Sequence, residues 1–292
     1  MWLKVEDWIE SSPPDKLRFR QAVHLILKAI ADSEELQPEM IMKGGMLLGI
    51  RYGSKRYTKD IDFSTGRKFT ADEIPRLESQ LNAQLDVAEA ELNYGLKCQF
   101  QSYQVQPSAN GTFPTVQIKI AYVAKDNAAQ LNRLKKKEVS SVISIDYSFN
   151  EQTYHKEILE LGDEHSKIQA YALIDVLAEK FRAVLQQKVR GRNREQDIYD
   201  LNFLINNTLP LTSEEAFQLV ETLIKKSEGK EISELLCVQG IRDPEIKLRS
   251  GERYLDLKDT VEELPDFESS YECVAQFFEA LPWKLFEPIP KK

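Results

Sequence analysis

Two aspartates stand one residue apart in a strand-like run, and they constrain the fold of this chain more than any other feature. Asp60 and Asp62 flank an isoleucine, and a phenylalanine follows, so charged and apolar residues alternate. Because side chains alternate between the two faces of a strand, both carboxylates project to one side, whereas Ile61 and Phe63 face a core. The pattern predicts a strand with one buried face and one face that carries two aligned carboxylates.

Two such carboxylates at the solvent end of a strand can bridge two Mg²⁺ ions roughly 3.5–4 Å apart, which supports in-line displacement at phosphorus. Upstream lies Gly44-Gly45, followed by the apolar run from Met46 to Leu48. Glycines there let backbone N–H groups approach a triphosphate, and the start of the following helix favours negative charge. Taken alone, an Asp-x-Asp is more often a solvated strand end, and a Gly-Gly pair is most often a turn.

Together these parts resemble the nucleotidyltransferase signature of the AbiEii/AbiGii toxin family. The resemblance is carried by Gly44-Gly45, Leu48 and the run from Arg56 to Phe63, and it extends over about residues 42–206. In that family the Gly-Gly turn and the Asp-x-Asp hold the triphosphate of an NTP and its metals. The resemblance implies these nucleotide-binding residues: Lys43, Gly44, Gly45, Arg56, Thr58 and, from a second signature, Lys180.

A third carboxylate follows in another alternating segment, residues 141–148. The apolar residues of this segment fall on one face of the predicted strand, and Asp146 falls on the other. Nucleotidyltransferases of this fold commonly take a third carboxylate from a neighbouring strand. The resemblance therefore implies that Asp146 joins Asp60 and Asp62 as a catalytic metal ligand, and the alternative is a solvated aspartate.

The second signature lies in residues 167–189, where apolar residues recur at helical spacing and predict one long helix. Lys180 borders the apolar stripe, where an ammonium is unfavourable unless it has an anionic partner or reaches solvent. Ala178 to Leu185 and Asp197 to Asp200 resemble the family's Glu-Lys-x-x-Ala-Leu helix and its Arg-Asp-x-x-Asp motif. By that resemblance Lys180 contacts nucleotide phosphates, and Asp197 positions it or supports the active site.

A basic loop lies between the two halves of that signature, and its cations are Lys188, Arg190, Arg192 and Arg194. Clusters of Arg and Lys bind phosphates by charge, so this loop is a candidate RNA-binding path, with a solvated turn as the alternative. A second basic run, residues 133–137, has the same two interpretations and a weaker claim. Gln196 stands where the family has an arginine, and Arg194 is near enough in sequence to substitute for it.

Other segments predict the elements around these motifs. Residues 16–31 carry a helical apolar stripe, and a capping-box pattern that begins at Thr70 predicts a helix over residues 71–82. Residues 97–105 and 115–123 alternate between polar and apolar side chains, so they predict a β-hairpin.

Beyond about residue 209 the sequence indicates helices, the first of them capped by Thr212 or Ser213. With the resemblance, these patterns predict an α+β fold. Residues 1–160 are expected to form a nucleotidyltransferase-like mixed sheet flanked by helices, and residues 161–292 a helical domain that completes the active site.

Composition fits such an enzyme, since 292 residues with 42% hydrophobic content can build two modest cores. We expect a cytoplasmic protein without a membrane partner, because the sequence has no apolar stretch of spanning length and no secretory signal at its start. The net charge of −8 argues against indiscriminate nucleic-acid binding. Three cysteines and three histidines show neither a disulfide framework nor zinc-ligand spacing.

The resemblance implies a nucleotidyltransferase toxin of type IV toxin–antitoxin or abortive-infection systems, with two Mg²⁺ ions, or Mn²⁺, as cofactors. It implies transfer of NMP from an NTP to an acceptor, for which the tRNA 3′ end is expected, and a cognate antitoxin as a partner. Growth arrest or phage defence would be the biological consequence. Two alternatives stay open: a transferase that modifies a protein or small molecule, and a nucleotide- or RNA-binding module without catalysis.

Overall fold

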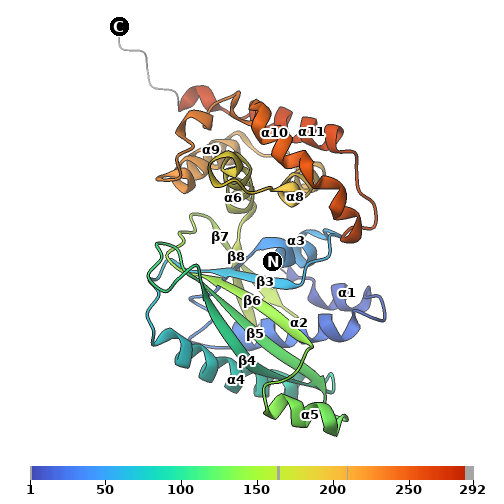
Figure 1. Ribbon diagram of the computed structural model, residues 1–292. Coiled ribbons are helices and arrows are strands. Elements are labelled where there is room, and N and C mark those ends of the chain that lie inside the picture. Colours follow the sequence, from blue (N-terminus) through green and yellow to red (C-terminus); the bar gives the residue numbers. More distant parts are fainter. Residues whose placement is uncertain (1, 163–164, 209, 287–292) are drawn as a thin grey trace. The chain divides into compact units, whose positions relative to one another are not determined.

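The alternating segment around Asp62 is an inner strand of a mixed β-sheet in the computed structural model (Figure 1). The structure describes residues 2–162, 165–208 and 210–286. The chain divides into two compact units, one comprising Met1–Gly53 with Thr58–Tyr171 and the other Ser54–Tyr57 with Ala172–Lys292. The sheet belongs to the first unit and the second unit is helical. The α+β class expected from the sequence is confirmed.

Within the described residues, the first unit contains an eight-stranded sheet with the order β1-β7-β8-β2-β3-β6-β5-β4. Its strands are β1 (Trp2–Leu3), β2 (Ile41–Lys43), β3 (Asp60–Ser64), β4 (Leu96–Gln106), β5 (Thr115–Ala124), β6 (Val142–Ser148), β7 (Lys156–Leu161) and β8 (Lys167–Tyr171). The pairs β1-β7, β2-β8 and β3-β6 are parallel. The expected hairpin is β4 and β5, which pair antiparallel.

One face of the sheet is apolar and packs against helices. The helices of this unit are α1 (Val5–Glu10), α2 (Leu17–Ala31), α3 (Gly44–Tyr52), α4 (Glu73–Leu92) and α5 (Ala128–Lys135). α2 and α4 pack against each other, and both contact β4 (Figure 1). Ile61 and Phe63 of β3 are fully buried, as are Ile143, Ile145 and Tyr147 of β6. The face assigned to the core from the alternation in the sequence is therefore the buried one.

The second unit is built from helices that pack on α6. Its helices are α6 (Leu173–Leu185), α7 (Gln187–Arg190), α8 (Glu195–Thr208), α9 (Ser213–Ser227), α10 (Pro244–Glu252) and α11 (Phe267–Glu279), with the 3-10 turns η1 (Ser233–Leu235), η2 (Gly240–Arg242), η3 (Tyr254–Asp259) and η4 (Trp283–Leu285). α6 packs against α8 and α9. Thr212 caps α9 in a complete capping box with Glu215, which confirms the start expected there.

The single helix expected over residues 167–189 is wrong at both ends. Residues 167–171 form β8, α6 begins only at Leu173, and a separate short helix α7 follows. β8 lies between β7 and β2, and four of its five residues are buried. A strand that is buried on both faces has no alternation, so periodicity alone cannot distinguish it from a buried helix.

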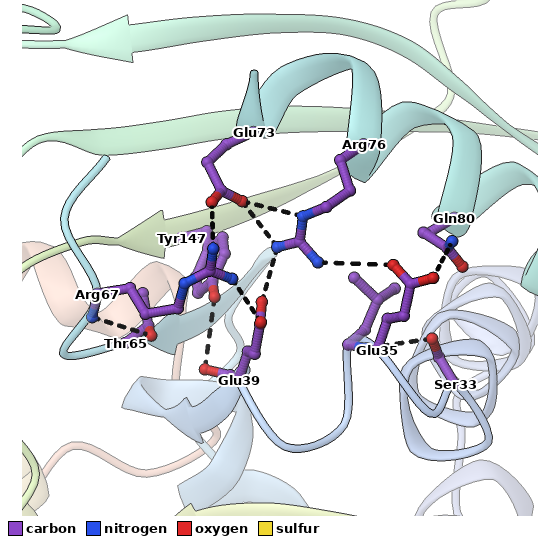
Figure 2. A network of polar contacts seen from close by, with 10 residues as sticks. Ser33, Glu35, Glu39, Thr65, Arg67, Glu73, Arg76, Gln80 and Tyr147 are labelled. Carbon is purple, nitrogen blue, oxygen red and sulfur yellow. Dashed lines mark hydrogen bonds and ion pairs between the residues drawn. The ribbon is translucent and has the colours of Figure 1, made fainter. Parts of the chain in front are cut away.

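The helix expected over residues 71–82 is also incorrect in its start and its length. α4 runs from Glu73 to Leu92, and its N-cap residue makes no side-chain cap hydrogen bond. Figure 2 shows the reason: the buried Glu73 carboxylate binds Arg67 and Arg76, each at 2.7 Å, instead of closing a capping box. Both guanidiniums also pair with Glu39, so this network joins the chain before β2, the loop after β3 and the start of α4.

None of the helices in the described part of the chain has the length and apolar character needed to cross a membrane.

Candidate active site

Asp60, Asp62 and Asp146 lie on the same face of two adjacent strands. β3 and β6 run parallel, and their register places Asp62 beside Asp146 and Asp60 beside Ser144. The intervening residues point into the core on the other face. Asp62 and Asp146 are half-buried. The structure thus brings together the three carboxylates that the sequence singled out.

The charges in this row repel one another. Partial desolvation raises the pKa of Asp60, and the nearby charge of Asp146 raises it further, whereas Lys59 lowers it. Across the described residues, no group of three or more His, Cys, Asp or Glu is already gathered tightly enough to hold a metal ion. The three aspartates nevertheless fit a divalent cation, because hard carboxylate oxygens suit Mg²⁺ and a cation offsets the repulsion that acts on Asp60.

Gly44 places the start of α3 against the carboxylate of Asp62. Its φ of +72° is a left-handed conformation that side chains rarely adopt, and a Cβ built there would overlap the Asp62 carboxylate. Gly45 follows in the first turn of α3, and the N-cap residue of this helix makes no side-chain cap hydrogen bond. The N–H groups of the first turn therefore lie where they favour negative charge beside the row of aspartates.

Lys43, expected to bind nucleotide, sits opposite Asp62 in the β2–β3 pairing. Its ammonium forms an ion pair with Glu151 at 2.5 Å, and Glu151 also accepts a hydrogen bond of 3.0 Å from the Tyr171 hydroxyl. Ser64 in turn donates to Tyr171 at 3.0 Å. No sequence pattern points to Glu151, because it is 108 residues from Lys43 along the chain.

The second unit contains a buried network of opposite charges. The Lys180 ammonium lies 2.9 Å from Asp197 Oδ1 and 2.7 Å from Asp200 Oδ2. Arg56 binds Asp200 with two hydrogen bonds of 2.8 Å, through Nε and Nη2. The anionic partner that Lys180 requires at an apolar face is thus a pair of aspartates. Asp200 was not singled out by the sequence, although it closes the Asp-x-x-Asp motif.

These contacts set the protonation of the network. Burial alone would lower the pKa of Lys180, but Asp197 and Asp200 raise it above its ordinary value. Burial would raise the pKa of Asp200, but Lys180 and Arg56 lower it below its ordinary value. Lys180 and Asp200 are therefore both charged at neutral pH, each held in that form by its partners in the network.

Arg56 reaches this network because its segment belongs to the helical unit. Ser54–Tyr57 lies between α3 and β3 in the chain but groups with the second unit. The backbone N–H of Tyr57 donates to the Thr260 carbonyl at 2.7 Å, which anchors the segment there. Thr58 is half-buried, and at this residue the chain again belongs to the first unit.

The basic loop gathers guanidiniums within the second unit. Burial lowers the pKa of Arg190, and the charges of Arg182, Arg192 and Arg194 lower it further. The ammonium of Lys188 instead forms an ion pair with Asp243 at 3.0 Å. Arg182, two residues beyond Lys180 on α6, was not predicted, and it extends this concentration of positive charge.

One terminal oxygen in this region has no hydrogen bond. In the part of the chain that the structure describes, Asp197 Oδ2 is buried without a hydrogen-bond partner. The Nη1 atom of Arg194 lies 3.9 Å from this oxygen. The Asp197 carboxylate therefore holds Lys180 with one oxygen and keeps the acceptor capacity of the other.

Known protein families and solved structures give matches over most of this chain. A family model described as "Nucleotidyl transferase AbiEii toxin, Type IV TA system" matches residues 25–277. The chain belongs to this family and is a nucleotidyl transferase. No curated protein matches it at a significant level.

Two crystal structures of Helicobacter pylori proteins share the fold. One protein, assigned as a nucleotidyltransferase, has 16% sequence identity and a TM-score of 0.52, and the match covers 95% of this chain and 100% of that one. The other, JHP933, has 16% identity and a TM-score of 0.54, with 94% and 97% covered. At this identity the likeness concerns the fold, and it confirms the nucleotidyltransferase-like sheet expected from the sequence.

Proposed function

We propose that this protein is a metal-dependent toxin that transfers NMP from an NTP to an acceptor, with Asp60, Asp62 and Asp146 as the metal-holding carboxylates. The observation that carries the proposal is the register of β3 and β6, which aligns Asp62 with Asp146 and keeps Asp60 on the same face. Two Mg²⁺ ions, or Mn²⁺, would supply charge stabilisation for the attacking and leaving oxygens of an in-line displacement.

The chain's own groups near this row would bind the triphosphate. Gly44 and Gly45 open α3 without side chains, so backbone N–H groups of the first turn can donate to phosphate oxygens. Lys43 supplies a cation opposite Asp62, and Glu151 holds that cation in place. We assign Asp146 the additional role of accepting the proton of the attacking hydroxyl, because it stands beside Asp62 on the next strand.

The charge network would serve the same reaction through its cations. We assign Lys180 and Arg56 to nucleotide phosphates and Asp197 to their positioning, in line with the family signature. The support is their connection: Asp200 binds both cations, and Asp197 binds Lys180. Thr58 completes the Arg-x-Thr element, and its hydroxyl is suited to a phosphate oxygen.

We propose that the acceptor is the tRNA 3′ end. The support is the guanidinium cluster of Arg182, Arg190, Arg192 and Arg194, because closely spaced cations that repel one another bind polyphosphate backbones. Such a reaction takes place in the cytoplasm, where it would arrest growth or block phage until a cognate antitoxin counters it. A protein or small-molecule acceptor, or binding without catalysis, remains the competing function.

The test is incubation of the protein with Mg²⁺, each labelled NTP in turn, and tRNA, protein or metabolite fractions. We expect one NTP to label tRNA, and we expect Asp60→Asn and Asp62→Asn each to remove nearly all transfer. The matched control is Asp126→Asn, which neutralises an exposed aspartate after β5 and should keep full transfer. Label in another fraction would identify a different acceptor. Full activity in both active-site variants would contradict the proposed metal site.

A further inference from the structure

A row of side chains crosses four strands at the level of Asp146. Lys43 of β2 pairs with Asp62 of β3, and Asp62 pairs with Asp146 of β6. Asp146 then pairs with Gln117 of β5. Residues that are direct partners in a sheet point to the same face, so Gln117 belongs to the face that carries the carboxylates. The sequence motifs gave Gln117 no role.

Gln117 contacts Asp146 directly. Its Nε2 donates a hydrogen bond of 3.0 Å to Asp146 Oδ1, and both side chains are half-buried. An aspartate on a strand can otherwise rotate about χ1 and χ2, and the repulsion between Asp146 and Asp60 favours rotation away from the row. A donor fixed on the neighbouring strand opposes that rotation.

The chemistry of this donor matters as much as its place. An amide donates a hydrogen bond but carries no charge, so the Asp146 carboxylate keeps its full attraction for a cation. An ammonium or guanidinium at the same position would form an ion pair and compete with the cation for the carboxylate. Carboxylates that bind metals are ordinarily held by hydrogen bonds from neighbouring groups. These hydrogen bonds orient the carboxylate and leave it free to bind the metal.

We propose that Gln117 is a positioning residue that orients the Asp146 carboxylate toward Asp62 for binding a divalent cation. This inference rests on the proposed function, because it concerns the same metal site. Gln117 would act through Asp146, to which its amide donates a hydrogen bond.

The experiment measures the Mn²⁺ dissociation constant of the full-length protein by electron paramagnetic resonance, with no nucleotide or acceptor present. Gln117→Met keeps the length of the side chain and removes the donor, and we expect Mn²⁺ to bind about tenfold more weakly. Gln104→Met is the matched control, because Gln104 is the partner of Gln117 on β4, one strand further from Asp146, and is exposed. It should bind Mn²⁺ as the wild type does.

Thermal melting of the same samples separates positioning from a general loss of structure. We expect the melting temperatures of Gln117→Met and Gln104→Met to match that of the wild type in the absence of Mn²⁺. If Gln117→Met melts early, Gln117→Asn decides instead: it keeps an uncharged amide but is one methylene shorter, so it cannot hold Asp146 in the same way and should still bind Mn²⁺ more weakly than the wild type. Wild-type affinity in the folded Gln117 variants would overturn the inference.

Asp62→Asn distinguishes this failure from failure of the proposed metal site. If Asp62→Asn loses Mn²⁺ binding while the Gln117 variants retain it, the metal site stands and the role of Gln117 is wrong. If the wild type itself shows no saturable Mn²⁺ binding, the proposed metal site and the role of Gln117 are both overturned.

Discussion

The two units of this protein hold their charges in opposite ways. In the first unit, Asp60 and Asp146 are like charges on one face of the sheet, and partial burial together with their repulsion raises the pKa of Asp60. In the second, Lys180 and Asp200 are buried opposite charges, and their attraction lowers the pKa of Asp200. An added cation stabilises an arrangement of like negative charges, because it offsets their repulsion. A network with equal numbers of cations and anions needs no added cation for this purpose. The comparison separates a row of carboxylates that repel one another from a network whose charges already balance one another.

The balanced network should break most severely when one partner is removed. Asp200→Ala leaves the Lys180 ammonium and the Arg56 guanidinium buried without their shared carboxylate. We expect the free energy of unfolding to fall by about 3–5 kcal/mol. Urea unfolding would measure it, with Asp259→Ala as a control at an exposed aspartate of the same unit. Equal stability of the two variants would mean that the network does not hold the second unit together.

A glycine substitution probes how closely the first unit packs around its charges. Gly44 and Gly53, at the two ends of α3, both have positive φ values of 72° and 76°. An added Cβ meets the Asp62 carboxylate at Gly44 but nothing within 4 Å at Gly53. Backbone strain should destabilise both alanine variants by about 1–3 kcal/mol, and Gly44→Ala should lose more. Only Gly44→Ala should also weaken NTP binding by calorimetry, and equal NTP affinity in the two variants would exclude a close approach of nucleotide to Gly44.

The basic loop tests whether the arginine cluster of the second unit binds an acceptor. Replacing Arg190, Arg192 and Arg194 by Ala should weaken tRNA binding and flatten its salt dependence, reducing the slope of log affinity against log salt by as much as about 2. NTP affinity should stay nearly unchanged. The control replaces Arg133, Lys135 and Lys136, an exposed run of the same charge in the first unit. The same loss in both triple variants would indicate nonspecific charge attraction.

The smallest expected effect concerns how stability depends on pH, which should differ in sign between Asp60 and Asp200. A carboxyl with a raised pKa in the folded state, such as Asp60, stabilises the fold below its unfolded pKa and loses that contribution as pH rises through its folded pKa. Asp60→Asn should therefore increase the stability of the metal-free protein at neutral pH by less than about 1 kcal/mol, because solvent screens this charge. The gain should vanish as pH falls toward about 4, near the ordinary pKa of Asp.

Asp200 should give the opposite dependence. Its lowered pKa means that its contribution is present above the unfolded pKa and is lost as pH falls through the folded pKa. The stability difference between wild type and Asp200→Ala should persist from neutral to mildly acidic pH and shrink only in stronger acid. Unfolding measured in EDTA over a pH series would show both effects, and parallel pH profiles for the two variants would contradict the comparison.

Local sequence patterns predicted the row of aspartates better than the partners of the cations. The alternation of side chains along a strand is set by backbone geometry, so the common face of Asp60 and Asp62 followed from two residues of sequence. The partners of the cations did not follow, because they meet across long separations: Glu151 is 108 residues from Lys43, and Asp200 is 144 residues from Arg56. Spacing patterns carry no information about such contacts.

The wrong element boundaries have the same origin. The capping-box pattern at Thr70 failed because Arg67 and Arg76 bind the Glu73 carboxylate, which the pattern assumed to be available. The sequence predicts a helix at β8 because the burial of this segment depends on the strands on both sides of it. In both cases tertiary contacts decided a structure that the local sequence left open.

The most direct test of the central claim measures the free energy of unfolding with increasing Mn²⁺. A cation that binds the folded row should stabilise the wild type by about 1.4 kcal/mol for each tenfold increase in Mn²⁺ above its dissociation constant. Asp62→Asn should show no such rise, while Asp259→Ala should respond as the wild type does. An unresponsive wild type, or an equal rise in Asp62→Asn, would contradict the assignment of the aspartate row as the metal site.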